Sequence, residues 1–107
     1  MLRPVPKNPY KKRKPKHSKR NNFSYKTRKQ VYERDKGLCR ECGREGTEVH
    51  HVRFRSQGGR GLYTNGLLLC RMCHIKMHQD YDLAKKWQDK FTEIYGPNYF
   101  RDEWDLE

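Results

Sequence analysis

Long apolar runs are absent from this sequence of 107 residues, of which only 33% are hydrophobic. The sequence therefore predicts neither a membrane-spanning helix nor a secretory signal peptide. Because so few apolar residues cannot build a large core, we expect one small domain that a metal, a disulfide or a partner stabilises.

Acidic residues are missing from residues 1–30, although this segment carries 12 of the 25 lysines and arginines. The other 13 basic residues are balanced by all 13 acidic residues in 31–107, since 13 − 13 = 0. The net charge of +12 therefore lies within the first 30 residues. A cationic segment attached to a neutral body favours nucleic acid as the partner.

Residues 1–22 hold four of the five prolines and few apolar groups, which predicts a disordered basic arm. We expect this arm to contact DNA or RNA, with a solubilising tail, a membrane-surface signal or a localisation signal as alternatives. The lack of an amphipathic apolar face argues against the membrane. The basic run expected to contact phosphates consists of Lys11, Lys12, Arg13 and Lys14.

Turn residues and changes in hydrophobic spacing divide the body of the chain into short elements. The predicted elements are a helix at 25–35, a strand at 49–54, a returning strand at 67–69, a helix after Cys73 that ends near residue 79, and a helix at about 82–95. A glycine-rich loop at 56–61 lies between the two strands.

The last of these helices has the clearest periodicity, with apolar residues at Leu83, Trp87, Phe91 and Ile94. We expect this stripe to pack on the core rather than to stack on bases. Asp82 is the expected N-cap, and the Gly96-Pro97 pair is expected to end the helix. The acidic residues 101–107 form a tail without a motif.

The four cysteines fall into two C-x-x-C pairs that are separated by 27 residues. Two thiolates on a tight turn converge on one ion, so this spacing favours metal over disulfides. A structural Zn²⁺ held by four sulfurs has no open position for chemistry. The ligands would be Cys39, Cys42, Cys70 and Cys73, and a reducing cytoplasm would suit their thiols.

Four of the five histidines lie between residues 50 and 78. His74 and His78 are four residues apart on a predicted helix, so both imidazoles can approach one metal ion. His50 and His51 are neighbours on a predicted strand, where side chains alternate between faces. One of them could therefore bind the ion while the other handles a proton. Extra zinc ligands or packed core histidines are the alternative.

Together these residues resemble the HNH, or ββα-metal (His-Me finger), endonuclease family. The resemblance rests on VHHV with His50 and His51, on Asn65 before LLLC, and on CHIKMH with His74 and His78. The two cysteine pairs match the zinc-bound branch common in small phage-encoded nucleases. This resemblance implies an α+β fold, with a ββα-metal core at about 38–80, a zinc knot and flanking helices within a nuclease domain at 23–100.

The resemblance also implies a role for each matching residue. His51 would be the general base, and Asn65 would fix its orientation by binding backbone or imidazole. His50 and His74 would hold a catalytic divalent ion (Mg²⁺, Mn²⁺, Ni²⁺, Co²⁺ or Zn²⁺), with His78 as a further ligand. Near these histidines, the candidates for phosphate contacts are Arg53, Arg55 and Arg60.

The function implied is a metal-dependent endonuclease that nicks or cleaves DNA, which we expect to be double-stranded. If the protein is phage-encoded, it would act in the host cytoplasm, and phage packaging proteins are candidate partners. Two alternatives remain: a non-catalytic zinc module that binds nucleic acid, and an accessory protein of a packaging motor.

Overall fold

A two-stranded antiparallel sheet lies at the centre of the computed structural model, which describes residues 14–106. Strand β1 (Glu48–His51) pairs with β2 (Gly66–Leu69), so that His50 lies opposite Leu67. Because side chains alternate along a strand, His50 and His51 lie on opposite faces of the sheet, as predicted. Strand β1 ends three residues earlier than the predicted strand at 49–54.

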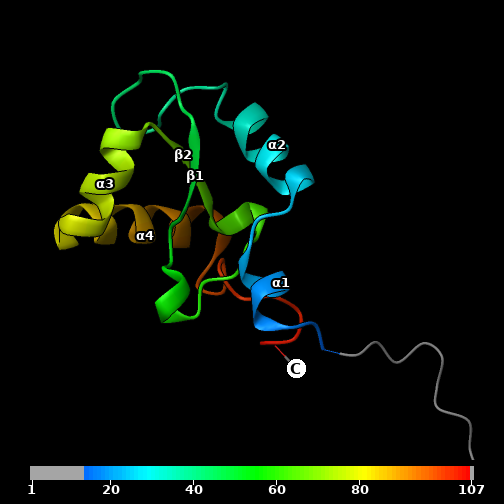
Figure 1. Cartoon of the computed structure of the whole chain (residues 1–107). Helices are drawn as coiled ribbons and strands as arrows, with labels where there is room; N and C mark the ends of the chain where they lie inside the picture. The colour runs from blue at the N-terminus through cyan, green and yellow to red at the C-terminus, as the bar shows by residue number, and fades with distance from the viewer. Residues whose placement is uncertain (1–13, 107) are drawn as a thin grey trace, which may run out of the picture.

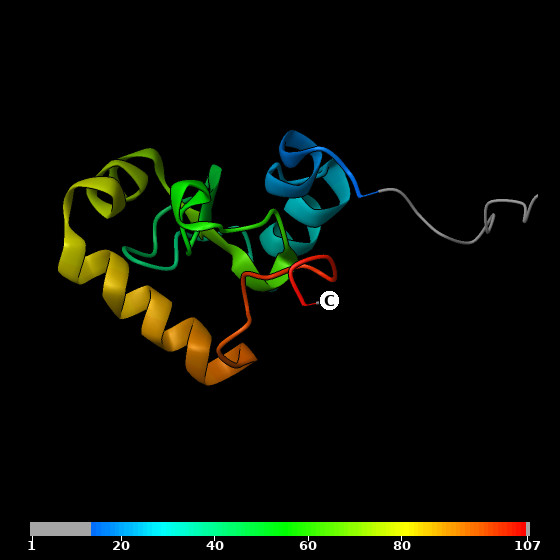
Figure 2. The same ribbon diagram turned by 90° about the horizontal axis from the view of Figure 1, so that it is seen from below.

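Helices cover both faces of the sheet, as Figures 1 and 2 show. Helix α2 (Tyr25–Arg34) packs on one face through the fully buried Val31. Helices α3 (Arg71–Gln79) and α4 (Tyr81–Tyr95) lie on the other side. There the buried core consists of Cys39, Val52, Leu67, Leu69, Cys73, Met77, Ala84, Trp87, Phe91 and Tyr99. The α+β architecture and the ββα core predicted from the sequence are confirmed.

Helix α4 follows the predicted limits with two corrections. Its N-cap is Asp80, whose carboxylate accepts a hydrogen bond from the Leu83 N–H at 3.1 Å, rather than Asp82. Gly96, with φ of 89°, ends the helix as predicted. Ile94 is 61% exposed, because the helix turns this position away from the core and partly buries Tyr95 instead.

A buried carboxylate, that of Asp35, joins α2 to the sheet. Its oxygens accept hydrogen bonds from Arg34 at 2.8 and 2.9 Å, from Arg40 at 2.7 Å and from the Leu68 N–H at 3.0 Å. Arg34 also donates to the carbonyl oxygens of Tyr63 and Gly66. Burial would raise the pKa of Asp35, but these donors, with Arg34 first, lower it below its usual value. The carboxylate therefore stays ionised and holds α2 in place.

The N-terminal and C-terminal segments meet in a cluster of ion pairs, which we call the terminal clasp (Arg20, Arg60, Asp102 and Asp105). Arg20 lies in α1 (His17–Asn21) and donates to Asp102 at 2.7 and 2.9 Å and to Asp105 at 2.8 Å. Arg60 donates to Asp105 at 3.0 and 2.9 Å. Figure 1 shows the C-terminal segment beside α1.

The terminal clasp corrects three expectations from the sequence. Residues 17–21, which were expected to belong to a disordered arm, form a helix whose Arg20 is buried. The described part of the tail, residues 101–106, is a structural element, since its carboxylates neutralise two buried guanidinium groups. Arg60 is 8% exposed and held by the tail, so it is not free to contact phosphate.

Most of the basic run expected to contact phosphates lies outside the described residues, namely Lys11, Lys12 and Arg13. Lys14 is described and is exposed. Within residues 14–106, the helices are too short and too polar for any of them to cross a membrane.

Candidate metal centres

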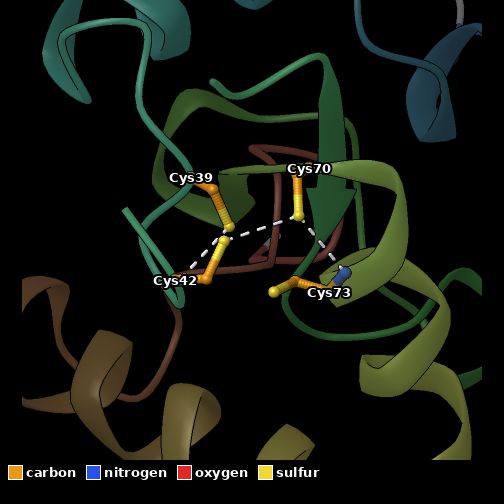
Figure 3. Close-up of side chains that lie close together, drawn as sticks. All are labelled: Cys39, Cys42, Cys70 and Cys73. Atoms are coloured by element: carbon orange, nitrogen blue, oxygen red, sulfur yellow. Dashed lines mark hydrogen bonds between the residues drawn. The ribbon is translucent and has the colours of Figure 1, made fainter. Parts of the chain in front are cut away.

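The four cysteines converge from two separate turns onto one point, as Figure 3 shows. All four thiols are free, and their sulfurs lie within 4.8 Å of one another. The Sγ atoms of Cys42 and Cys70 are 3.6 Å apart. A tetrahedral Zn²⁺ with Zn–S bonds of about 2.3 Å separates its sulfurs by about 3.8 Å, so this set fits zinc.

Each C-x-x-C turn is shaped so that its sulfurs point inward. The Sγ of Cys39 accepts the Cys42 N–H at 3.5 Å, and the Sγ of Cys70 accepts the Cys73 N–H at 3.4 Å. Burial would raise the pKa of Cys39, but backbone N–H groups, that of Cys42 first, lower it to about 7. Donors aimed at sulfur favour the thiolate, which is the form that binds metal.

Helix α4 holds the first cysteine turn against the core. The indole N–H of the buried Trp87 donates to the Glu41 carboxylate at 2.6 Å, and Lys86 donates to the same group at 3.1 Å. Glu41 lies between Cys39 and Cys42. The predicted role of the α4 stripe in packing on the metal-bearing core is therefore confirmed for Trp87 and Phe91.

A second set of ligand atoms lies beside this knot, on β1 and α3. The rings of His50, His74 and His78 form a nearly equilateral triangle, with centroid separations of 5.1, 5.2 and 5.2 Å. One ring nitrogen from each lies within 4.8 Å of the others. The spacing of four residues puts His74 and His78 on one face of α3, as predicted.

His50 gives the strongest support for a metal site. It is 1% exposed, and within residues 14–106 both of its ring nitrogens are buried without a hydrogen-bond partner. An unpaired buried imidazole is costly, whereas a metal ion would satisfy one of these nitrogens. Burial first, and then the neighbouring His74 and His78, lower the pKa of His50 to about 2. The ring is therefore neutral at physiological pH, as a metal ligand must be.

Glu48 orients His74 and was missed in the sequence. Its Oε2 lies 3.1 Å from Nδ1 of His74. If Nδ1 carries the proton and donates it to this carboxylate, Nε2 is left as the ligand nitrogen, which is a common arrangement around metal-binding histidines. Its position two residues before His50 on the same strand puts Glu48 on the same face of the sheet, and this spacing could have identified it.

His51 is held in a different way from the three clustered histidines. Its Nε2 lies 2.5 Å from the carbonyl oxygen of Asn21, and its ring packs on Phe23 with centroids 4.2 Å apart. A carbonyl oxygen can only accept, so Nε2 carries the proton and Nδ1 of the neutral ring keeps its lone pair. Burial is the main cause that lowers the pKa of His51, with a further contribution from Arg55.

Asn65 fixes backbone rather than the ring of His51. It is fully buried; its side-chain oxygen accepts the Arg53 N–H at 2.7 Å, and its amide donates to the carbonyls of Arg53 and Arg60 at 3.2 and 2.9 Å. These hydrogen bonds replace the backbone hydrogen bonds between the two strands, so β1 ends at His51. A Cβ on Gly59 would lie 1.8 Å from the Arg53 carbonyl oxygen, so the close loop requires glycine there.

Only one of the three arginines proposed to contact phosphate faces the histidines. Arg55 is exposed and lines the same hollow as His51, His74 and His78. Arg53 instead packs over the Phe100 ring at 5.1 Å and donates to Gln88 at 3.4 Å. The third, Arg60, belongs to the terminal clasp.

Comparison with known protein families gives a match. The model of the HNH endonuclease family matches residues 39–80, from the first cysteine to the end of α3. This match confirms the family resemblance predicted from the sequence, and it covers both cysteine pairs and all four histidines described above. No curated protein matches the chain.

Proposed function

We propose, from the match of residues 39–80 to HNH endonucleases, that the protein is a metal-dependent endonuclease that hydrolyses phosphodiester bonds in DNA. One observation carries this proposal: three imidazoles converge on a common point, and a fourth imidazole beside them keeps a free ring nitrogen. A purely structural metal site would not need the fourth histidine.

His50 and His74 are the proposed ligands of a catalytic divalent ion, and His78 is a third. The unpaired nitrogens of His50 support this assignment. When bound, such an ion supplies positive charge to the scissile phosphate and to the departing 3′ oxygen. Imidazole ligands suit Mn²⁺, Co²⁺, Ni²⁺ and Zn²⁺, and Mg²⁺ becomes suitable where phosphate oxygens and water complete the shell.

His51 is the proposed general base, acting through Nδ1. This atom would take a proton from the attacking water while the water oxygen bonds to phosphorus and the P–O3′ bond breaks, and the departing 3′ oxygen would take its proton from solvent water. The products would carry 5′-phosphate and 3′-hydroxyl ends. The lowered pKa of His51 keeps its ring neutral near pH 7, and the Asn21 carbonyl fixes its tautomer. Asn65 would act indirectly on His51, by holding the backbone that follows β1.

The proposed substrate is double-stranded DNA, cut in one strand or in both. The net charge of +12 and the exposed Arg55 support a polyanionic substrate. Four reduced thiols that converge on one point are suited to a reducing cytoplasm. An origin in a phage, with a role in DNA packaging, is our proposal for the biological setting and rests on the resemblance of the motif order alone.

Plasmid cleavage tests this function. Zinc-loaded protein is incubated with supercoiled plasmid while divalent ions are added one at a time, and nicked and linear products are separated on a gel. We expect cleavage with at least one ion, and His51→Ala should lower the rate by about 10²-fold or more. His17→Ala, which removes an exposed histidine of α1, is the matched control.

Two results would contradict the proposal. Cleavage by His51→Ala at the parent rate would remove the proposed base. If the parent protein cuts plasmid with none of the ions but still binds DNA, the non-catalytic zinc module would be favoured instead.

A further inference from the structure

A groove of about 640 Å³ lies between α2 and β1, next to the histidines. One wall is formed by α2, through Tyr25, Arg28, Lys29 and Tyr32. The opposite wall includes His51 and His74. The groove therefore leads directly to the proposed base, from the face of the sheet that α2 covers.

The residues of the α2 wall share one face of the helix. Positions 25, 28, 29 and 32 follow the i, i+3, i+4, i+7 spacing that places side chains in a single stripe. Tyr25 is 82% exposed and Tyr32 is 49% exposed. This spacing was visible in the sequence, but only the structure places the stripe beside the histidines.

The fold does not use the two cations of this stripe. The side chains of Arg28 and Lys29 are exposed, and neither has a hydrogen-bond or ion-pair partner among residues 14–106. Arg34, on the inner side of the same helix, is bound instead by Asp35 and by backbone carbonyls. The carboxylate of Glu48, which also lines the groove, is paired with His74. The positive charge of the α2 wall is therefore available to a ligand.

We propose that this groove binds an unpaired stretch of the DNA strand on one side of the scissile phosphate. The inference deepens the proposed function and rests on it. Arg28 and Lys29 match the charge of successive phosphates, while the two exposed tyrosines offer faces on which bases stack. In a duplex the bases already stack on each other, so the tyrosines would have no base to contact. Arg55, at the histidine end, faces the phosphate that is cut.

Binding measured without cleavage tests this inference. Zinc-loaded full-length protein, without added divalent ion, is titrated by fluorescence anisotropy against three DNAs of equal length: blunt duplex, duplex with a single-stranded flank, and single strand. For the flanked and single-stranded DNAs, Tyr25→Ala should weaken affinity at least about five-fold, because one base–aromatic stack is lost. Affinity for the blunt duplex should stay within about two-fold.

The charge of the groove is tested on the same helix. Arg28→Gln with Lys29→Gln should reduce the slope of log affinity against log salt for the single-stranded DNA by about 1.4, since each phosphate contact contributes about 0.7. Lys26→Gln is the matched control for Lys29→Gln, because Lys26 is exposed on α2 but does not line the groove.

The outcomes separate this inference from the proposed function. Equal loss of affinity in Lys26→Gln and Lys29→Gln, or equal loss for blunt and flanked DNA in Tyr25→Ala, would overturn the inference even if the parent cuts plasmid. If no ion supports cleavage but the flanked DNA shows the expected losses, the groove is a strand-binding site and the nuclease proposal fails alone.

Discussion

Replacing Asp105 with asparagine should lower both the stability of the protein and the rate of DNA cleavage. The Asp105 carboxylate accepts hydrogen bonds from Arg20 at 2.8 Å and from Arg60 at 3.0 and 2.9 Å. The side chains of these arginines are only 2% and 10% exposed. An amide in this place cannot neutralise them, so Arg60 is left with Asp102 at 3.9 Å as its nearest carboxylate.

The size of the stability loss follows from this geometry. Removing one partner of a fully buried ion pair costs about 3–5 kcal/mol. Asp105 is 21% exposed, and Asp102 still pairs with Arg20, so we expect a smaller loss, about 2 kcal/mol. For a domain of this size, that corresponds to a fall in Tm of about 10 °C.

The activity should fall because the terminal clasp reaches the proposed base. Arg60 donates to the side-chain oxygen of Asn21 at 2.7 Å, and the Asn21 carbonyl accepts the proton on His51 Nε2. If loosening Asn21 removes one orienting hydrogen bond worth about 1 kcal/mol, kcat should fall about five-fold.

Thermal unfolding of the zinc-loaded protein and initial rates of plasmid nicking measure the two effects. Glu103→Gln is the control, because this acid is exposed in the same tail. A Tm within about 2 °C of the parent would refute the stability estimate. A lowered Tm with unchanged kcat at a temperature where the variant is folded would refute the link from the clasp to His51.

Three further predictions concern single side chains. Cys70→Ser should leave the zinc knot with three thiolates and unfold much of the domain, because metal binding supplies folding free energy. Circular dichroism and zinc content would test this. A melting curve like that of the parent would argue against the zinc knot. Glu48→Gln should weaken the apparent affinity for the activating ion about 10-fold or more, measured by ion titration of cleavage, and an unchanged titration would exclude a positioning role. Burial raises the pKa of Tyr99 to about 12, so an unfolded chain releases this proton near pH 10 while the folded one keeps it. Stability should therefore decrease from pH 10 to 12; Tyr99→Phe should flatten that decrease, and an equal slope in both proteins would contradict the assignment.

Local signals in the sequence predicted the parts of the fold that depend on neighbouring residues. Spacing of four residues placed His74 and His78 on one helix face, and strand alternation separated His50 from His51. The C-x-x-C turns predicted the sulfur cluster. Each of these depends on contacts within a few residues, or on a ligand set whose geometry is fixed by its chemistry.

Such local signals could not predict contacts between residues that are far apart in the sequence. Arg20 and Asp102 are 82 residues apart, and the charge of each segment alone resembled that of a solvated arm or tail. The bond between His51 and Asn21 spans 30 residues and uses a backbone carbonyl, which carries no sequence signature. The end of β1 was also misjudged, because the Asn65 amide replaces the pairing that VHHVRF would otherwise continue.

Helix α3 begins at the sulfur cluster and carries His74 immediately after Cys73. Oxidation of the thiols to a disulfide would release the zinc and loosen the first turn of this helix. The imidazole nitrogens would then no longer converge on one metal position. The proposed hydrolysis would therefore depend on the redox state of sulfur atoms that lie outside the proposed active site. An oxidant should abolish DNA cleavage, and a reductant added together with zinc should restore it.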